Sequence, residues 1–122
     1  LVLVSKLSKE DGFRLAEKIV KEFDGVDGIF SANDFAAIGV MNHLKRIGVK
    51  IPQDIAIAGF SNEPTSEVIE PSLTTVDQSG NEIGRLACNL LLDYFENGNT
   101  LVNDKTIMIQ PQLIVRNSTR KK

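Results

Sequence analysis

Residues 28–39 read GIFSANDFAAIG, and this stretch decides the fold. Its first part, Gly28–Ala32, is an apolar run of the kind that forms a buried strand. Asn33 and Asp34 then open a helix, because asparagine is a favoured N-cap residue. The apolar residues on one face of that helix are Ala37, Val40, Met41 and Leu44. The stretch therefore predicts a strand followed by an amphipathic helix.

The same strand–helix order lies on both sides of this stretch. Leu1–Val4 is an apolar run that we expect to be a strand, and the capping pattern Ser8-Lys9-Glu10-Asp11 opens a helix after it. Ile55–Phe60 (IAIAGF) is apolar throughout, as expected of a strand covered on both faces. The alternation predicts an α/β fold with a parallel sheet and right-handed crossovers.

The alternation breaks after Phe60, where the chain becomes polar. The apolar residues from Ile83 to Phe95 have the spacing of a strongly amphipathic helix. The elements expected in this part are a short helix from Pro64, an extended piece at Leu73–Val76, a helix opened by a capping box at Ser79–Glu82 and ended by Gly98, and strands at Thr106–Gln110 and Leu113–Val115.

Composition excludes several classes of protein. The 122 residues are 42% hydrophobic and 25% charged, which is typical of one soluble globular domain. A net charge of -2 disfavours a nucleic-acid surface on this segment, and no apolar run approaches the ~20 residues that span a bilayer. One cysteine makes neither an internal disulfide nor a multi-thiolate metal site. Because the chain opens inside an apparent strand without Met, we expect it to be a piece of a longer protein.

Polar side chains follow three of the expected strands. Ser5, Asn33 and Ser61 are each a polar residue at the point where an apolar run ends. Ligands bind outside the carboxyl ends of strands in open parallel sheets, so these side chains predict a rim for a neutral hydroxylated ligand. The alternative is structural: Asn33 caps its helix, and Ser61 opens a turn.

Catalytic groups are sparse, so we predict that the chain is not an enzyme and holds no metal or cofactor. His43 has no metal or triad partner on its helix face and is expected to be solvated, and Cys88 has no adjacent base. Glu67 and Glu70 lie in a polar turn with nothing to raise a pKa. The basic residues near the end are expected to form a solubilising tail, comprising Arg116, Arg120, Lys121 and Lys122.

Five segments together resemble the C-terminal part of a LacI/GalR (lactose-repressor) family regulator. They are GIFSANDFAAIG at 28–39, GVKIPQDIAIAGFSN at 48–62, PSLTTVDQ at 71–78, residues 84–92, and LIVRNST at 113–119. The resemblance implies a periplasmic-binding-protein-like (Rossmann-like) lobe, as a fragment of a two-lobed core. It also implies a homodimer, a small effector bound between the lobes, and operator DNA bound by an N-terminal head that is absent from this chain.

The resemblance also assigns residues to the effector site. Asn33 falls where the family binds effector hydroxyls, and Gln78 falls at the crossover between lobes. Ser61 replaces a common aspartate, and Leu7 stands where many members have an aromatic ring. These two departures favour an anionic or less polar effector over a simple monosaccharide.

The same resemblance predicts the domain organisation and the dimer. Residues 1–76 would form the C-terminal lobe, 77–111 would cross into the N-terminal lobe, and 112–122 would return with the basic tail. The apolar stripe from Ile83 to Phe95 would then lack its sheet, so we expect the fragment to dimerise, swap or repack. The residues expected at the dimer interface of the intact protein are Ile38, Val68 and Ile69, which the alternative interpretation makes plain core.

We therefore predict the effector-binding and dimerisation region of a cytoplasmic bacterial transcriptional regulator, whose effector is a carbohydrate or a derivative. A periplasmic sugar-binding protein of a transport system is the alternative, since it shares the fold. A Rossmann-like enzyme lacks both a nucleotide-binding glycine loop and catalytic groups here. A helix-turn-helix upstream of Leu1 would favour the regulator, and a signal peptide there would favour the transport protein.

Overall fold

The computed structural model describes residues 1–97 and 106–120. The elements in chain order are α1 (Lys9–Glu22), β1 (Gly28–Phe30), α2 (Asp34–Arg46), β2 (Ala56–Ala58), α3 (Thr65–Val68), β3 (Thr75–Asp77), α4 (Gly80–Glu96) and β4 (Gln112–Ile114). They fall into two compact units, Leu1–Asp77 with Leu113–Lys122, and Gln78–Gln112. No helix within the described ranges is long and apolar enough to cross a membrane.

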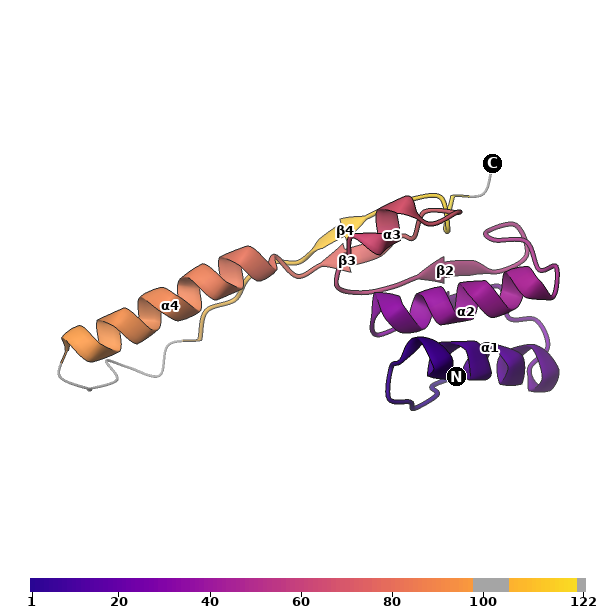
Figure 1. Ribbon diagram of the computed structural model, residues 1–122, viewed down its shortest axis with the longest axis horizontal. Helices are drawn as coiled ribbons and strands as arrows, with labels where there is room; N and C mark the ends of the chain where they lie inside the picture. Colours follow the sequence, from indigo (N-terminus) through magenta and orange to yellow (C-terminus); the bar gives the residue numbers. More distant parts are fainter. Residues whose placement is uncertain (98–105, 121–122) are drawn as a thin grey trace. The chain divides into compact units, whose positions relative to one another are not determined.

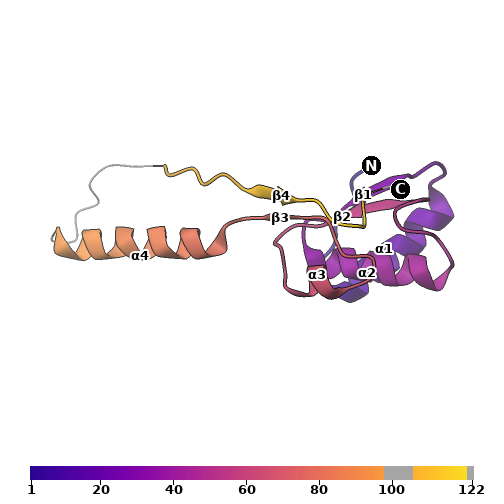
Figure 2. The ribbon, with the colours of Figure 1, turned by 90° about the horizontal axis from the view of Figure 1, so that it is seen from above.

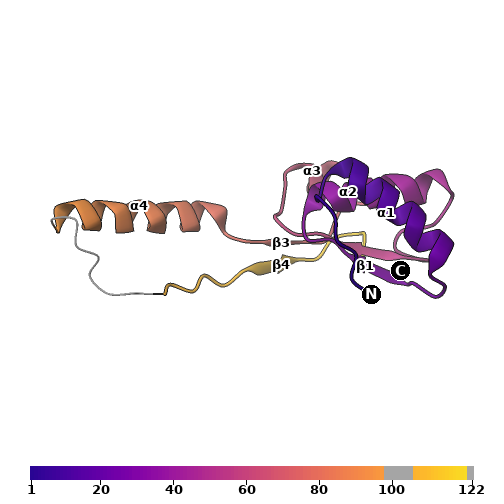
Figure 3. The same ribbon diagram turned by 90° about the horizontal axis from the view of Figure 1, so that it is seen from below.

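In the first unit, β1 and β2 form a parallel pair with α2 as the crossover, which confirms the predicted alternation (Figure 2). The register pairs Gly28 with Ala56, Ile29 with Ile57 and Phe30 with Ala58. An isolated parallel bridge joins Ala58 to Thr74 just before β3. β3 and β4 form a second two-stranded sheet and lie side by side in Figure 3.

Helices α1 and α2 pack closely because glycines replace side chains where they meet (Figure 1). A Cβ on Gly12 would overlap the carbonyl of Ala36, and a Cβ on Gly39 would overlap the carbonyl of Lys9. The two helix backbones therefore touch directly, and neither glycine can be replaced without moving a helix.

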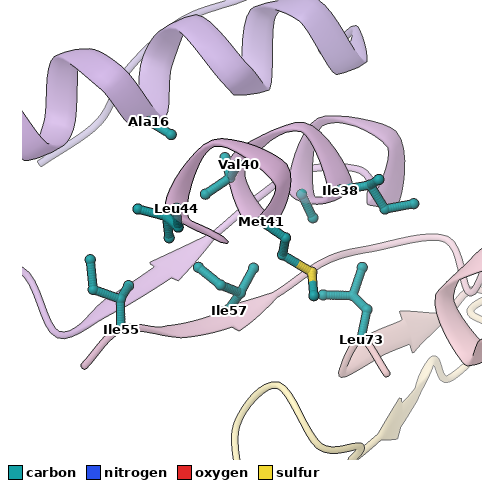
Figure 4. Packing of buried hydrophobic residues seen from close by; sticks show 9 residues of the cluster. Ala16, Ile38, Val40, Met41, Leu44, Ile55, Ile57 and Leu73 are labelled. Atoms are coloured by element: carbon teal, nitrogen blue, oxygen red, sulfur yellow. The ribbon is translucent and has the colours of Figure 1, made fainter. Parts of the chain in front are cut away.

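The core lies between α2 and the β1–β2 pair. Leu44 of α2 faces Ile55 and Ile57, while Met41 points toward Leu73 (Figure 4). The apolar face predicted for α2 is thus buried as expected. The buried cluster comprises Ala16, Ala37, Ile38, Val40, Met41, Leu44, Ile55, Ile57 and Leu73.

Two expected strands are wrong. Leu1–Val4 forms no strand, and three of its four side chains are exposed, so the apolar run did not suffice without a pairing partner. Residues 106–110 are also irregular, and β4 begins only at Gln112, after Pro111. The expected end of α4 at Gly98 lies outside the described residues.

Two local expectations are also wrong. Ser79 sits in the left-handed region, with φ 57°, and its side chain makes no capping bond to α4. His43 is buried and not solvated, because its ring packs edge-on against Phe13 of α1 with 4.7 Å between ring centroids. Its Nδ1 is buried without a hydrogen-bond partner among the described residues.

Candidate functional site

The candidate site lies at the carboxyl ends of β1 and β2. The Ser31 amide continues the pairing by donating to the Ala58 carbonyl over 2.8 Å. Phe30 of β1 is paired with Ala58 of β2. Asn33 lies three residues after Phe30, and Ser61 lies three residues after Ala58. The register therefore brings these two predicted residues to the same edge of the sheet.

Each end of the Asn33 amide makes one hydrogen bond within the chain, which leaves one N–H and one oxygen lone pair for a ligand. Its Oδ1 accepts from the Ala36 N–H over 2.8 Å and caps α2, as the structural alternative predicted. Its Nδ2 donates to the Leu7 carbonyl over 2.9 Å. Asn33 thus fixes residue 7 at the edge where a ligand would lie.

Leu7 belongs to a short segment that is held in place from several sides. It has φ 59°, and its amide donates to the Ser5 Oγ over 3.1 Å. The neighbouring Lys6 amide donates to Asp11 Oδ2 over 3.0 Å, and Asp11 also accepts from the Arg14 guanidinium. That guanidinium is the main reason that the pKa of Asp11 lies below its ordinary value of 3.8.

An apolar cavity of about 560 Å³ adjoins this segment. It contacts Ser5 and Leu7 and runs along β1, but it touches neither Asn33 nor Ser61. Most of its lining is apolar and comes from the N-terminal residues, α1, β1 and α2. It therefore extends the candidate site along Leu7 and adds few polar groups.

Ser61 occupies a conformation that L-residues rarely adopt. Its φ is 113°, and the next residue, Asn62, has φ 51°. The Ser61 amide donates to the Val76 carbonyl over 2.9 Å, so the segment after β2 runs beside β3. The positive φ of Ser61 costs of order 1–3 kcal/mol, whereas asparagine adopts the left-handed region of Asn62 routinely.

Arg116 is not part of a solvated tail, which corrects the expectation for that residue. Its Nη1 donates to the Leu73 carbonyl over 2.9 Å, and its Nη2 donates to Asn62 Oδ1 over 2.9 Å. Asn62 Nδ2 in turn donates to Asp77 Oδ2 over 3.0 Å. Asn62 therefore bridges a cation and an anion that lie on two different segments.

Asp34 is not among the site residues predicted from the sequence, although it follows Asn33 directly. Its carboxylate is 0% exposed and accepts from the Glu63 amide over 2.8 Å, from Ser66 Oγ over 2.7 Å and from Thr75 Oγ1 over 2.7 Å. One signal in the sequence could have pointed to a buried role: Asp34 is an acidic residue beside the N-cap that has no basic residue three or four positions away to pair with.

The other predicted residues lie elsewhere. Gln78 is exposed and is the first residue of the second unit. Of the residues predicted at the dimer interface, Ile38 is 7% exposed within the core cluster, and Ile69 packs against that cluster. Val68 is 82% exposed. Within the described ranges, no group of three acidic, His or Cys side chains could hold a metal ion.

Residues 4–119 match the family described as periplasmic binding protein-like domain. The chain is 36% identical over 110 residues to the NTD biosynthesis operon regulator NtdR of Bacillus subtilis, covering 90% of this chain and 33% of NtdR. It is 33% identical over 107 residues to the HTH-type transcriptional repressor PurR of Vibrio vulnificus, covering 87% of this chain and 31% of PurR. The chain thus spans about a third of these relatives.

Solved structures are also similar. A putative LacI-family transcriptional regulator from Sanguibacter keddieii superposes with a TM-score of 0.90 at 28% identity, over 97% of this chain and 43% of that one. LacI-family regulators from Arthrobacter sp. FB24, in complex with lactose, and from Enterococcus faecium, with bound ribose, give TM-scores of 0.84 and 0.83, both at 29% identity. They are matched over 93% and 98% of this chain and over 42% and 43% of their own chains.

The parallel α/β arrangement and these matches confirm the resemblance drawn from the sequence motifs. The chain belongs to the periplasmic-binding-protein-like domain family, and it is similar in sequence and structure to transcriptional regulators that include LacI-family members.

Proposed function

We propose that this chain forms the effector-binding and dimerisation region of a bacterial DNA-binding transcriptional regulator. The observation that carries the proposal is the convergence of Asn33, Leu7 and Ser61 at the carboxyl ends of the parallel strands. Similar chains carry lactose and ribose in their solved structures, which supports a sugar or sugar-like effector.

The chemistry of the rim favours a ligand held by neutral hydrogen bonds and apolar contact. Asn33 supplies amide groups, Ser61 a hydroxyl, and Leu7 an apolar side chain beside the cavity. Serine at 61 lacks the charge of the aspartate common in the family, so we propose an anionic or less polar sugar derivative. If Ser61→Asp in the complete protein left effector preference unchanged, this part of the proposal would be dropped.

The regulator would work by a population shift. An effector that binds one conformation of the protein more strongly than another would shift the protein toward that conformation. Operator DNA would be bound by an N-terminal head in the cytoplasm, and the chain itself would carry out no catalysis.

A periplasmic sugar-binding protein remains the alternative function. The relatives NtdR and PurR are both named as regulators, which favours the first proposal. A change in operator affinity when a sugar is added would distinguish the two functions, because a transport receptor has no operator.

The binding test uses two matched variants of the complete protein, titrated in a calorimeter with ribose, lactose and the anionic sugar glucuronate. Asn33→Ser keeps a good N-cap but removes the amide group, and binding should weaken about fivefold to tenfold. Ser8→Ala removes the cap that Ser8 Oγ gives the Asp11 amide, and the dissociation constant should stay within about twofold of wild type while stability falls by about 1 kcal/mol. Equal loss of binding in both variants would contradict a direct role for Asn33.

The dimer proposal rests on Val68. The exposed apolar side chain of Val68 lies at the end of α3. Ile38 belongs to the buried core of the same unit, and Ile69 packs against that core. Val68→Asp should convert the complete protein from dimer to monomer at micromolar concentration in sedimentation analysis. Val20→Asp, at an exposed valine of α1, serves as the control and should leave the dimer intact.

A further inference from the structure

Asp34 accepts hydrogen bonds from two different parts of the chain, one just after the predicted site residue Ser61 and one just before the predicted site residue Gln78. Oδ2 accepts from the Glu63 amide and Ser66 Oγ, in the segment just after Ser61. Oδ1 accepts from Thr75 Oγ1, in the strand just before Gln78. The three bonds are 2.7–2.8 Å long, and the carboxylate is completely buried.

The surroundings leave this carboxylate no freedom to move. Gly59 lies so close that a Cβ there would overlap Asp34 Oδ1. Thr75 Oγ1 also accepts from the Asn62 amide over 3.2 Å, so the same hydroxyl links Asp34 to the strained turn at 61–62. No salt bridge involves Asp34 in the described part of the chain, and the N-terminus of α2 stabilises its charge instead.

We propose that Asp34 is a positioning residue for the effector site: its buried carboxylate holds the 61–66 segment and β3 in the geometry that presents Ser61 beside Asn33. The inference rests on the proposed function for its ligand, but the positioning itself is a property of the unliganded protein. An ionised carboxylate suits this role because it only accepts hydrogen bonds and can satisfy three donors at once.

The main experiment measures amide hydrogen exchange in the complete, unliganded protein. Asp34→Asn keeps the shape of the side chain but replaces a charged acceptor by a neutral one, so the Glu63 amide should exchange roughly tenfold faster. Ile55→Val, a mild core change just before β2, is the control for general loss of stability. In each variant the exchange rate of the Glu63 amide is divided by that of the Val49 amide, which donates to the Leu44 carbonyl. This ratio should be larger in Asp34→Asn than in Ile55→Val.

Two substitutions of Thr75, one that keeps the hydroxyl and one that removes it, test the proposal if Asp34→Asn does not fold. Thr75→Ser keeps the bond to Asp34 Oδ1 and should leave the exchange of the Glu63 amide, which donates to Asp34 Oδ2, near the wild-type rate. Thr75→Val has nearly the same shape but loses the hydroxyl that bonds Asp34, so the Glu63 amide should exchange faster. Equal exchange of the Glu63 amide in Thr75→Ser and Thr75→Val would overturn the proposal. A scaled exchange rate of the Glu63 amide in Asp34→Asn that is no higher than in Ile55→Val would also overturn it.

Titration with ribose, lactose and the anionic sugar glucuronate then tests whether this positioning affects binding. If wild type binds a sugar, Asp34→Asn should bind it about tenfold more weakly, and Ile55→Val should bind it unchanged. Equal affinity in Asp34→Asn and wild type would overturn the positioning role. If wild type binds none of the three sugars, the proposed effector class is contradicted, while the exchange data still decide whether Asp34 holds the 61–66 segment.

Discussion

Helices α2 and α4 are both amphipathic, yet only α2 has a buried face. Nine of the 13 residues of α2 are buried, and none of the 17 residues of α4 is. Helix α2 packs on a parallel strand pair and on a second helix, whereas α4 exposes large apolar side chains such as Leu91 and Phe95. Apolar spacing therefore identifies a helix and its apolar face, but a long-range partner decides whether that face is buried.

The largest effect on the free energy of unfolding is expected from truncating a buried leucine of α2, in comparison with an exposed leucine of α4. Leu44 is 0% exposed, and Leu44→Ala should lower the free energy of unfolding of residues 1–122 by about 3 kcal/mol. Leu91 is 56% exposed, and Leu91→Ala should lower it by less than about 0.5 kcal/mol. Urea denaturation measures both. A loss above about 2 kcal/mol for Leu91→Ala would mean that α4 buries this face in the chain in solution.

A glycine pair sharpens the same contrast. A Cβ at Gly39 would meet the backbone of α1, so Gly39→Ala should destabilise the chain by about 1–3 kcal/mol. Nothing lies within 4 Å of a Cβ at Gly84 of α4, so Gly84→Ala should stabilise that helix by about 0.5–1 kcal/mol. Circular dichroism during thermal unfolding would detect opposite shifts. The comparison fails if both substitutions change the melting temperature in the same direction.

A smaller effect is expected at the strained turn of the rim. Ser61 has φ 113°, and glycine adopts that conformation freely, so Ser61→Gly should raise stability by about 1 kcal/mol. Ser5→Gly, at another rim serine, is the control because Ser5 is not a positive-φ residue and gains no such relief. Denaturant midpoints should move in opposite directions for the two variants, and a lower midpoint for Ser61→Gly would show that the turn stores no strain.

The smallest effect is a pH dependence at the start of α1. Arg14 holds the pKa of Asp11 below 3.8, so this carboxylate stabilises the folded chain above that pH. The stabilisation should be lost as the pH falls below 3.8 and through the lower pKa of the folded state. Wild type should therefore lose more stability than Asp11→Asn between pH 5 and pH 2. Parallel stability curves for the two proteins would contradict the assignment.

Local sequence patterns predicted the elements whose signals are complete within a few residues. The Ser8 and Asn33 caps form as expected, and the parallel pairing of β1 with β2 follows from the apolar runs and the helix between them. Ser79 carries the same kind of capping pattern, but its backbone is left-handed and it makes no cap. The pattern around Ser79 could not reveal this, because it specifies side chains that can cap a helix and not the backbone conformation of the cap residue.

Long-range contacts limited the prediction of the candidate site. The edge formed by Asn33 and Ser61 could be predicted, because the carboxyl ends of parallel strands meet. The roles of Asp34 and Arg116 could not, since their partners Thr75 and Asn62 lie 41 and 54 residues away. His43 was misjudged for the same reason, because Phe13 on another helix covers it.

The central claim is that the strand-end rim of this chain binds a sugar or a sugar derivative. The most direct test maps amide chemical shifts of the complete protein during titration with the anionic sugar glucuronate, with ribose and lactose as parallel probes. The proposal predicts saturable shifts centred on Leu7, Asn33 and Ser61, with little change at Val49, which lies just beyond the opposite end of α2. Saturable binding of a sugar with shifts confined to other surfaces, or no binding of any of the three, would contradict it.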